Sequence, residues 1–206
     1  MAQNDFEQRH LETLDRDLNR FSALEQATAY TSRPMMGLGV SLVFILVAGL
    51  VAFYLFGQTG NTLVVVIAAG FGAYMALNIG ANDVANNMGP AVGANALTMG
   101  GAIAIAAVFE SAGALLAGGD VVSTIAKGII APQSMQTASI FIWAMLAALL
   151  SAALWVNLAT WVGAPVSTTH SVVGGVMGAG IAAAGFAAVN WPTMYKIAAS
   201  WVISPV

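Results

Sequence analysis

Two short polar strings interrupt an otherwise apolar sequence, and their residue types suit ion chemistry. The first, residues 80–90, reads GANDVANNMGP and places three Asn and one Asp within six residues. Carboxylate and amide oxygens are ligands for hard cations such as Na+, and a carboxylate can also carry a proton. On a helix, Asn82 and Asn86 would share one stripe, and Asp83 and Asn87 the next. The string predicts a cation site, and a polar loop of ordinary turn residues is the alternative.

The second string, residues 163–171, reads GAPVSTTHS, and its proline followed by hydroxyl residues is typical of a helix start. The free N–H groups of such a start would join the hydroxyls of Ser167, Thr168 and Thr169 in a donor-rich, partly positive pocket. An oxyanion could bind there without Arg or Lys. The alternative is that the hydroxyls cap the helix and that His170 is an interfacial residue bonded to a carbonyl.

A single carboxylate, Glu110, lies inside an apolar segment, IAAVFESAGALLAG. Burying a carboxylate at the centre of a membrane helix costs about 2.5 to 3.5 kcal/mol, so such a residue is a candidate for function. Glu110 could carry a coupling proton or anchor a gate through polar partners, and a fixed structural hydrogen bond is the alternative. Asp120 and Lys127 fall in a connection, where we expect solvated side chains.

The elements that must position these residues follow from composition. Of 206 residues, 59% are hydrophobic and 7% are charged, with a formal net charge of -3. Ten of the fifteen charged residues lie between Asp5 and Arg33, which leaves five for residues 34–206. Five charges cannot cover a soluble surface, so the sequence predicts an integral membrane protein. The lack of a basic cluster argues against nucleic-acid binding, and the absence of Cys excludes disulfides and thiolate chemistry.

Apolar runs predict an all-α, polytopic bundle of membrane helices. The runs cover residues 35–56, 62–79, 98–118, 138–162 and 165–189, and a sixth begins near 197. Backbone groups in hydrocarbon need internal partners, so the polar strings predict broken helices that line a cavity. The connection 119–136 should form a loop or short re-entrant segments. Gly174 and Gly178, at GxxxG spacing, favour close helix packing.

Residues 1–33 form the soluble-looking part of the chain, and their pattern predicts an amphipathic helix at the membrane surface or a short self-associating helix. The apolar face would consist of Leu11, Leu14, Leu18 and Phe21. Arginines before the first membrane span favour a cytoplasmic N-terminus.

The two strings, extended to NIGANDVANNMGPAVGANALT and WVGAPVSTTHSVVGGVMGAG, occur in an order that closely resembles the inorganic phosphate transporter (PiT) family. The segments FESAGALLAG and IAKGII are also similar to that family, and the resemblance covers roughly residues 62–206. It implies a secondary transporter with two inverted repeats, each contributing an Asn-Asp and a Ser-Thr-Thr motif to a central site.

The resemblance also implies residue roles. The cation and phosphate site would include Asn82, Asp83 and Asn86, the phosphate oxygens would contact Ser167, Thr168 and Thr169, and Glu110 would be a buried residue needed for transport. No cofactor is implied beyond a co-transported H+ or Na+, and Na+ would bind at Asn82 and Asp83.

The sequence holds one copy of each motif and stops inside an apolar run, SWVISPV, so we expect the first half of a longer transporter. Residues 62–206 would form a first repeat truncated at its C-terminal end, and residues 34–61 an additional N-terminal span and loop. The second repeat would come from the same longer chain or from a second chain, as in a homodimer.

The predicted function is symport of inorganic phosphate with H+ or Na+ across the cell (inner) membrane, by a multi-pass protein that is not an enzyme. A permease for sulfate or another tetrahedral oxyanion, with the same fold, is the nearest alternative. An intramembrane hydrolase could use Ser167, His170 and Asp83, but the sequence lacks the GxSxG context of such enzymes. A scaffold or sensor assembled through the N-terminal helix is a third class.

Overall fold

The computed structural model describes residues 35–58 and 60–203, and they form an all-helical structure. The chain divides into two compact units, residues 1–47 and 48–206. The predicted amphipathic helix at 1–33 lies outside the described residues. Four described helices are long and apolar enough to cross a membrane. They are Met35–Phe56, Thr62–Gly93, Met99–Gly128 and Ala138–Trp161.

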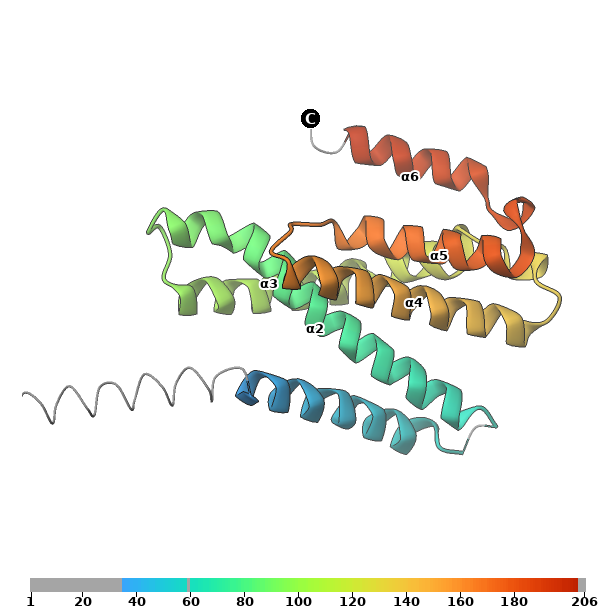
Figure 1. Ribbon diagram of the computed structural model, residues 1–206, viewed down its shortest axis with the longest axis horizontal. Coiled ribbons are helices and arrows are strands. Elements are labelled where there is room, and N and C mark those ends of the chain that lie inside the picture. The colour runs from blue at the N-terminus through green and yellow to red at the C-terminus, as the bar shows by residue number, and fades with distance from the viewer. Residues whose placement is uncertain (1–34, 59, 204–206) are drawn as a thin grey trace, which may run out of the picture. The chain divides into compact units, whose positions relative to one another are not determined.

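The larger unit contains five labelled α-helices, joined by short 3₁₀ and π-helical segments (Figure 1). They are α2 (Thr62–Gly93), α3 (Met99–Ser123), α4 (Ala138–Trp161), α5 (Thr168–Ala184) and α6 (Trp191–Ile203). A π-helical turn, Thr124–Gly128, extends α3. Two 3₁₀ turns, Pro132–Ser134 and Phe186–Ala188, precede α4 and α6.

The first polar string does not break its helix, so that prediction is wrong. Helix α2 runs through residues 80–90 and contains Pro90. It ends at Gly93, and the left-handed Asn95 (φ 57°) forms a Schellman-type cap in which the N–H of Ala96 donates to the carbonyl of Ala91 at 2.9 Å. Membrane helices tolerate a proline when neighbouring groups satisfy the backbone, and no residue in the string adopts the left-handed conformation that ends a helix.

The second polar string is a true break between α4 and α5. Gly163 has φ of 71°, and the N–H of Ala164 donates to the carbonyl of Ala159 at 2.8 Å, which closes a Schellman motif. Pro165 follows in the non-helical link, and α5 begins at Thr168 rather than at the proline. The predicted run to residue 189 ends at Ala184, because Gly185 has a positive φ of 80°.

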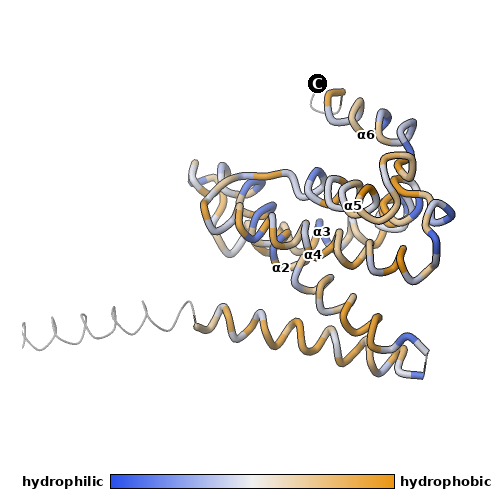
Figure 2. The backbone as a smooth tube through the Cα atoms, turned by 45° about the vertical axis from the view of Figure 1, so that its right-hand side comes forward, coloured by the Kyte–Doolittle hydropathy of each residue, from blue (hydrophilic) through white to orange (hydrophobic). Residues whose placement is uncertain are grey.

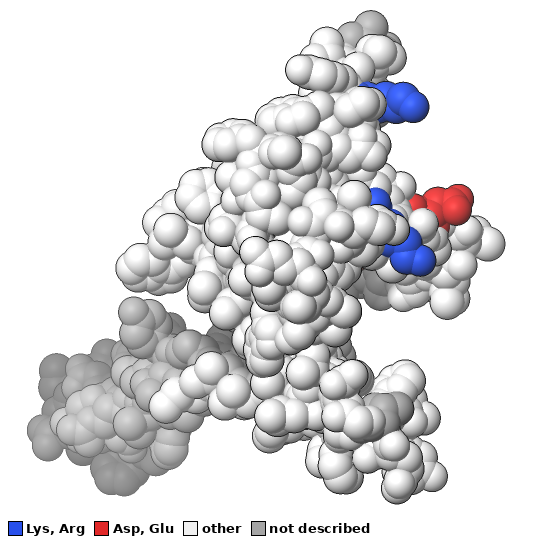
Figure 3. Space-filling model, turned by 90° about the vertical axis from the view of Figure 1, so that its right-hand side faces the viewer, with Lys and Arg blue, Asp and Glu red and all other residues white. Residues whose placement is uncertain are grey.

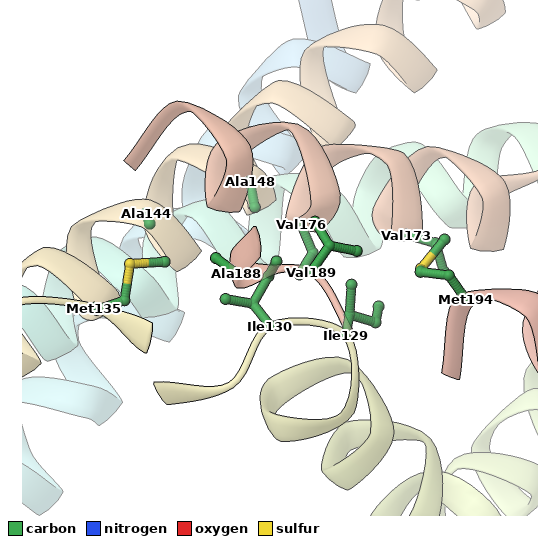
Figure 4. Packing of buried hydrophobic residues seen from close by; sticks show 10 residues of the cluster. All are labelled: Ile129, Ile130, Met135, Ala144, Ala148, Val173, Val176, Ala188, Val189 and Met194. Carbon is green, nitrogen blue, oxygen red and sulfur yellow. The ribbon is translucent and has the colours of Figure 1, made fainter. Parts of the chain in front are cut away.

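The connection between α3 and α4 supplies two of the largest fully buried side chains of the core. Ile129 and Ile130 are 0% and 1% exposed and lie in a cluster with Val173 and Val176 of α5 (Figure 4). Ile130 forms an antiparallel bridge with Val189 of the connection between α5 and α6. The predicted connection thus contains a π-helical turn, a 3₁₀ turn and a buried pair of isoleucines.

Helices α4 and α5 run side by side, and Gly175 allows their close approach (Figure 1). A Cβ on Gly175 would lie 2.7 Å from the carbonyl oxygen of Ala148. A Cβ on Gly174 or Gly178 would meet no atom within 4 Å in the described part of the chain. The prediction of close packing through Gly174 and Gly178 is therefore wrong by one position on the helix: Gly175 turns toward α4, whereas its neighbour does not.

The surface of the described residues is mostly apolar. Hydrophobic residues dominate the long helices, and hydrophilic ones gather at their ends and connections (Figure 2). The face in Figure 3 carries few charged side chains. Leu115 and Leu116 of α3 are each 88% exposed. Helices that are apolar all round require lipid or further protein around them.

Candidate functional site

A hydrogen bond between two side chains joins the two polar strings across 85 positions of sequence. The hydroxyl of Thr168, the first residue of α5, donates to Oδ2 of Asp83 on α2 at 2.8 Å. Thr168 is buried and Asp83 is half-buried. The bond places a carboxylate beside the N-terminus of α5, where the helix dipole favours negative charge. Within the described residues, Oδ1 of Asp83 accepts no hydrogen bond.

Asn82, one position before this carboxylate, uses its whole hydrogen-bonding capacity. Its Nδ2 donates to the Thr160 hydroxyl at 3.1 Å and to the Ala164 carbonyl at 3.3 Å. Its Oδ1 accepts from Nδ2 of Asn86 at 2.8 Å and from the N–H of Val166 at 3.4 Å. Two donors and two acceptor sites complete the inventory of an amide side chain. Asn82 thus fixes the end of α4 and the following link against α2.

A second amide pair extends this contact along α2 and α4. Asn157 Nδ2 donates to Oδ1 of Asn78 at 2.8 Å, and Asn78 Nδ2 donates to the Tyr74 carbonyl at 2.9 Å. Our sequence reasoning did not single out either residue. The available signal was Asn78 four positions before Asn82 and a lone Asn in the apolar run of α4, which together predict a polar seam between membrane helices.

The remaining amides of the first string are more open. Asn86 is exposed and bonds to Asn82, which confirms the predicted pairing at a spacing of four. Asn87 is also exposed and makes no hydrogen bond in the described part of the chain. Pro90 has no N–H to donate to the carbonyl of Asn86, four residues earlier. Oxygen atoms of Asn86 therefore lie on the same helix as the free Asp83 oxygen, one turn away.

The three adjacent hydroxyls of the second string have different surroundings. Ser167 is the N-cap of α5, and its Oγ accepts from the N–H of His170 at 3.3 Å. Thr168 turns to Asp83, whereas Thr169 lines a cavity of about 280 Å³ with Asp120 of α3 and residues of α6. Consecutive residues on a helix point about 100° apart, so the hydroxyls fan out around the helix start. The N–H groups of Thr168 and Thr169 donate to no acceptor among the described residues.

His170 contacts side chains rather than the carbonyl expected from sequence. Its Nδ1 lies 2.6 Å from the Oγ of Ser167, and its ring stacks on Trp201 of α6 with a centroid separation of 3.7 Å. Ser167 and His170 line an open cavity of about 370 Å³. Asp83 is bonded to Thr168, not to this histidine, so the three residues do not form the arrangement of a hydrolytic triad.

Glu110 lies apart from these contacts in the present structure. It is exposed on α3, and residues 35–58 and 60–203 offer it no hydrogen bond or ion pair. Asp120, also on α3, lies at the wall of the Thr169 cavity. The structure therefore joins Asp83 directly to Thr168, ties Asn82 to the link before α5, and leaves Glu110 outside these contacts.

Comparison with known proteins identifies the family of this chain. Residues 79–206 match the model of the phosphate transporter family. The chain belongs to this family. A Helicobacter pylori protein named as a phosphate permease is 52% identical over 191 residues, which cover 92% of this chain and 36% of that protein. Inorganic phosphate transporter 2-1, chloroplastic, of Arabidopsis thaliana is 49% identical over 137 residues, or 66% of this chain and 23% of the relative.

A solved structure, the sodium-dependent phosphate transporter, shares the fold. It is 41% identical, with a TM-score of 0.61, and the match covers 80% of this chain and 36% of the solved one. The chain thus spans little more than a third of its similar relatives. Membership confirms a multi-pass membrane protein of a transporter family, not an enzyme family.

Proposed function

We propose that this chain contributes to a symporter that moves inorganic phosphate together with Na+. The observation that carries the proposal is the bond from Thr168 to Asp83, because it joins a candidate cation-binding carboxylate to the candidate anion-binding start of α5. The family and the phosphate-related names of its members support phosphate as the substrate. The name of the solved relative supports Na+, and coupling to H+ is the alternative.

Phosphate would bind at the N-terminus of α5, through the N–H groups of Thr168 and Thr169 and through the hydroxyls of Ser167, Thr168 and Thr169. The carboxylate of Asp83 already places a negative charge beside Thr168. Two like unit charges about 4 Å apart repel by about 4 kcal/mol at an effective dielectric constant of about 20. A cation on the free oxygen of Asp83 would remove that repulsion, so each ion would raise the affinity for the other.

The cation site would be built on α2. Asp83 Oδ1 and the oxygens of Asn86 are hard ligands of the kind that Na+ prefers. Asn82 would have to release Asn86 or Val166 before its own oxygen could bind Na+, so its direct role as a ligand stays a prediction. In its present contacts Asn82 holds the link before α5 in position. Glu110 would act in transport from α3, outside this cluster.

The proposal includes an assembly and a location. Residues 62–206 would form the first of two inverted repeats, preceded by a span and loop at 34–61 and a surface helix at 1–33. The second repeat would be supplied by the same longer chain or by another copy. The transporter would lie in the cell (inner) membrane with a cytoplasmic N-terminus, and rocking of one repeat against the other would expose the site alternately.

The test is uptake of radiolabelled phosphate into proteoliposomes that contain the full-length protein, driven by a Na+ gradient. Asp83→Asn should abolish uptake, because it removes the charge that binds the cation. Asn87→Ala is the matched control on the same helix and should keep uptake. Unchanged uptake by Asp83→Asn would contradict the proposal. Uptake driven by a proton gradient alone would show that the coupling ion is H+ rather than Na+.

Sulfate competition tests the substrate in the same assay. A site that accepts a hydrogen bond from HPO4(2-) through Asp83 leaves that acceptor unpaired with fully deprotonated sulfate. Excess sulfate should therefore leave phosphate uptake unchanged. Inhibition by sulfate at concentrations comparable to phosphate would favour a general oxyanion permease.

A further inference from the structure

His170 and Ser167 form a close pair whose proton arrangement has two forms. The distance between Nδ1 of His170 and Oγ of Ser167 is 2.6 Å. The same Oγ accepts from the backbone N–H of His170 at 3.3 Å. A serine hydroxyl has one proton to donate and two acceptor sites. The position of one proton on Nδ1 therefore decides where the Ser167 hydroxyl proton points.

When Nδ1 carries no proton, it accepts the hydroxyl proton of Ser167, and Ser167 turns a lone pair toward the cavity. When Nδ1 carries a proton, Ser167 Oγ accepts two N–H groups, and its own O–H must find another acceptor. Residues 35–58 and 60–203 provide no such acceptor, so the hydroxyl is left to donate into the cavity of about 370 Å³ that both residues line. The first form repels an oxyanion oxygen, and the second binds it.

The ring is held in place from its other side. Trp201 of α6 stacks on His170 at 3.7 Å with an interplanar angle of 27°. An aromatic face favours a cation above it, so this contact is compatible with a protonated imidazole. Nε2 makes no hydrogen bond within the described residues, and the side chain is exposed, so proton exchange with water is open.

No other titratable group pairs directly with this imidazole in the described part of the chain. On α6, the titratable side chains are Tyr195 and Lys196, and on α3, Asp120 lines a cavity with Trp201. On α2, Asp83 reaches α5 through Thr168. Helix α4 and the link 162–167 contain no titratable side chain.

We propose that His170 is a positioning residue for the oxyanion site, which turns the Ser167 hydroxyl toward the anion when Nδ1 is protonated. The inference rests on the proposed function, and it adds a proton-linked donor to that site. A neutral ring that carries its proton on Nε2 gains the Nδ1 proton when it becomes protonated, so proton uptake by this form and oxyanion binding at Ser167 favour each other. Histidine suits this role because its neutral ring has one donor and one acceptor nitrogen, whereas its protonated ring donates from both.

The test measures the affinity of the full-length protein for radiolabelled inorganic phosphate at about pH 6 and about pH 8, the range in which histidine titrates. The variants are Ser167→Ala, His170→Ala and the double variant, and the quantity compared is the affinity ratio to wild type at equal pH. Phosphate itself titrates in this range, but that contribution cancels in the ratio. Thr137→Ala, which removes the N-cap of α4, is the control.

We expect Ser167→Ala to weaken binding by about tenfold at the lower pH, the size of one charge-assisted hydrogen bond, and far less at the higher pH. His170→Ala should abolish this pH dependence, and the double variant should bind no more weakly than Ser167→Ala. Ratios that do not change with pH, or losses that add in the double variant, would overturn the role of His170. Absence of phosphate binding by the wild type at both pH values would instead overturn the proposed function and the inference with it.

The proton position can be observed directly. Comparison of the ¹⁵N spectra of labelled imidazoles in the wild type and in His170→Ala assigns the resonances of His170. Phosphate should move the His170 Nδ1 resonance toward its protonated value in the wild type and not in Ser167→Ala. If phosphate binds and the His170 Nδ1 resonance does not shift, the proposal is overturned.

Discussion

The polar strings at 80–90 and 163–171 look alike in sequence, since both combine Gly, Pro and small polar residues, but they fold differently. The first continues as helix α2, with its amides bonded to one another and to α4. The second opens into a non-helical link, because Gly163 adopts a left-handed conformation. A polar string thus breaks a membrane helix where a left-handed residue allows an exit, not where polarity alone is high.

The two strings therefore contribute differently to the site. Helix α2 supplies a fixed surface, called the wall below, in which Asn82 is fully hydrogen-bonded and Asp83 has one free oxygen. The break supplies unpaired N–H groups and hydroxyls at the start of α5. Substitutions in these two parts should therefore differ in their effects on stability, and Asn82 should have the largest effect.

Replacing Asn82 should weaken the fixed wall most. Asn82→Ala removes four hydrogen bonds made by a buried amide and leaves three half-buried partners without it, which should lower the free energy of unfolding by about 3 kcal/mol. Thermal unfolding of the purified protein in detergent measures the change. Asn87→Ala, exposed on the same helix, should have a small effect. Equal losses in the two variants would mean that the wall does not depend on the Asn82 contacts.

Packing of the helix after the break should be sensitive at one glycine. Gly175→Ala brings Cβ against the Ala148 carbonyl and should destabilise the α4–α5 pair by about 2 kcal/mol. Gly174→Ala, one position away and free of contacts in the described structure, should be neutral or slightly stabilising. The same unfolding assay distinguishes them, and a larger loss for Gly174→Ala would reverse the assigned helix faces.

Capping should account for the stability effect of Ser167 but not for its effect on binding. Ser167→Ala and Thr137→Ala each remove an N-cap and should each cost about 1 kcal/mol of stability. Phosphate affinity should fall for Ser167→Ala only. Equal binding by the two variants would reduce Ser167 to a cap.

Glu110 should show the opposite pattern, a small effect on stability and a large one on transport. Because the described residues give it no partner, Glu110→Gln should change the free energy of unfolding by less than about 0.5 kcal/mol. Phosphate uptake should nevertheless be lost, as the family resemblance implies. Wild-type uptake by this variant would remove Glu110 from the mechanism.

Much of this architecture could be predicted from sequence, because apolar length and helix caps are local properties. The spans that became α3 and α4 were expected from the apolar runs 98–118 and 138–162, and the hydroxyl-rich start of α5 from the Ser-Thr-Thr motif. The continuity of α2 through Pro90 was not predicted, because the partners of its polar groups lie about 80 positions away, on α4. The burial of Ile129 and Ile130 was not predicted either, because it depends on contacts with α5.

The site was predictable as two lists of residues but not as a junction. Sequence placed Asp83 and Thr168 in separate motifs, and their hydrogen bond is a tertiary contact between α2 and α5. The saturation of Asn82 was equally invisible, because it requires Thr160, Ala164 and Val166 at one end of α4.

The central claim is that Asp83 couples a cation to phosphate at the start of α5. The direct measurement is the phosphate affinity of wild type and Asp83→Asn in high and in minimal Na+, with choline holding the ionic strength constant. The account predicts that Na+ tightens phosphate binding to the wild type by about tenfold or more and has no such effect on Asp83→Asn. An undiminished Na+ response in Asp83→Asn, or none in the wild type, would contradict it.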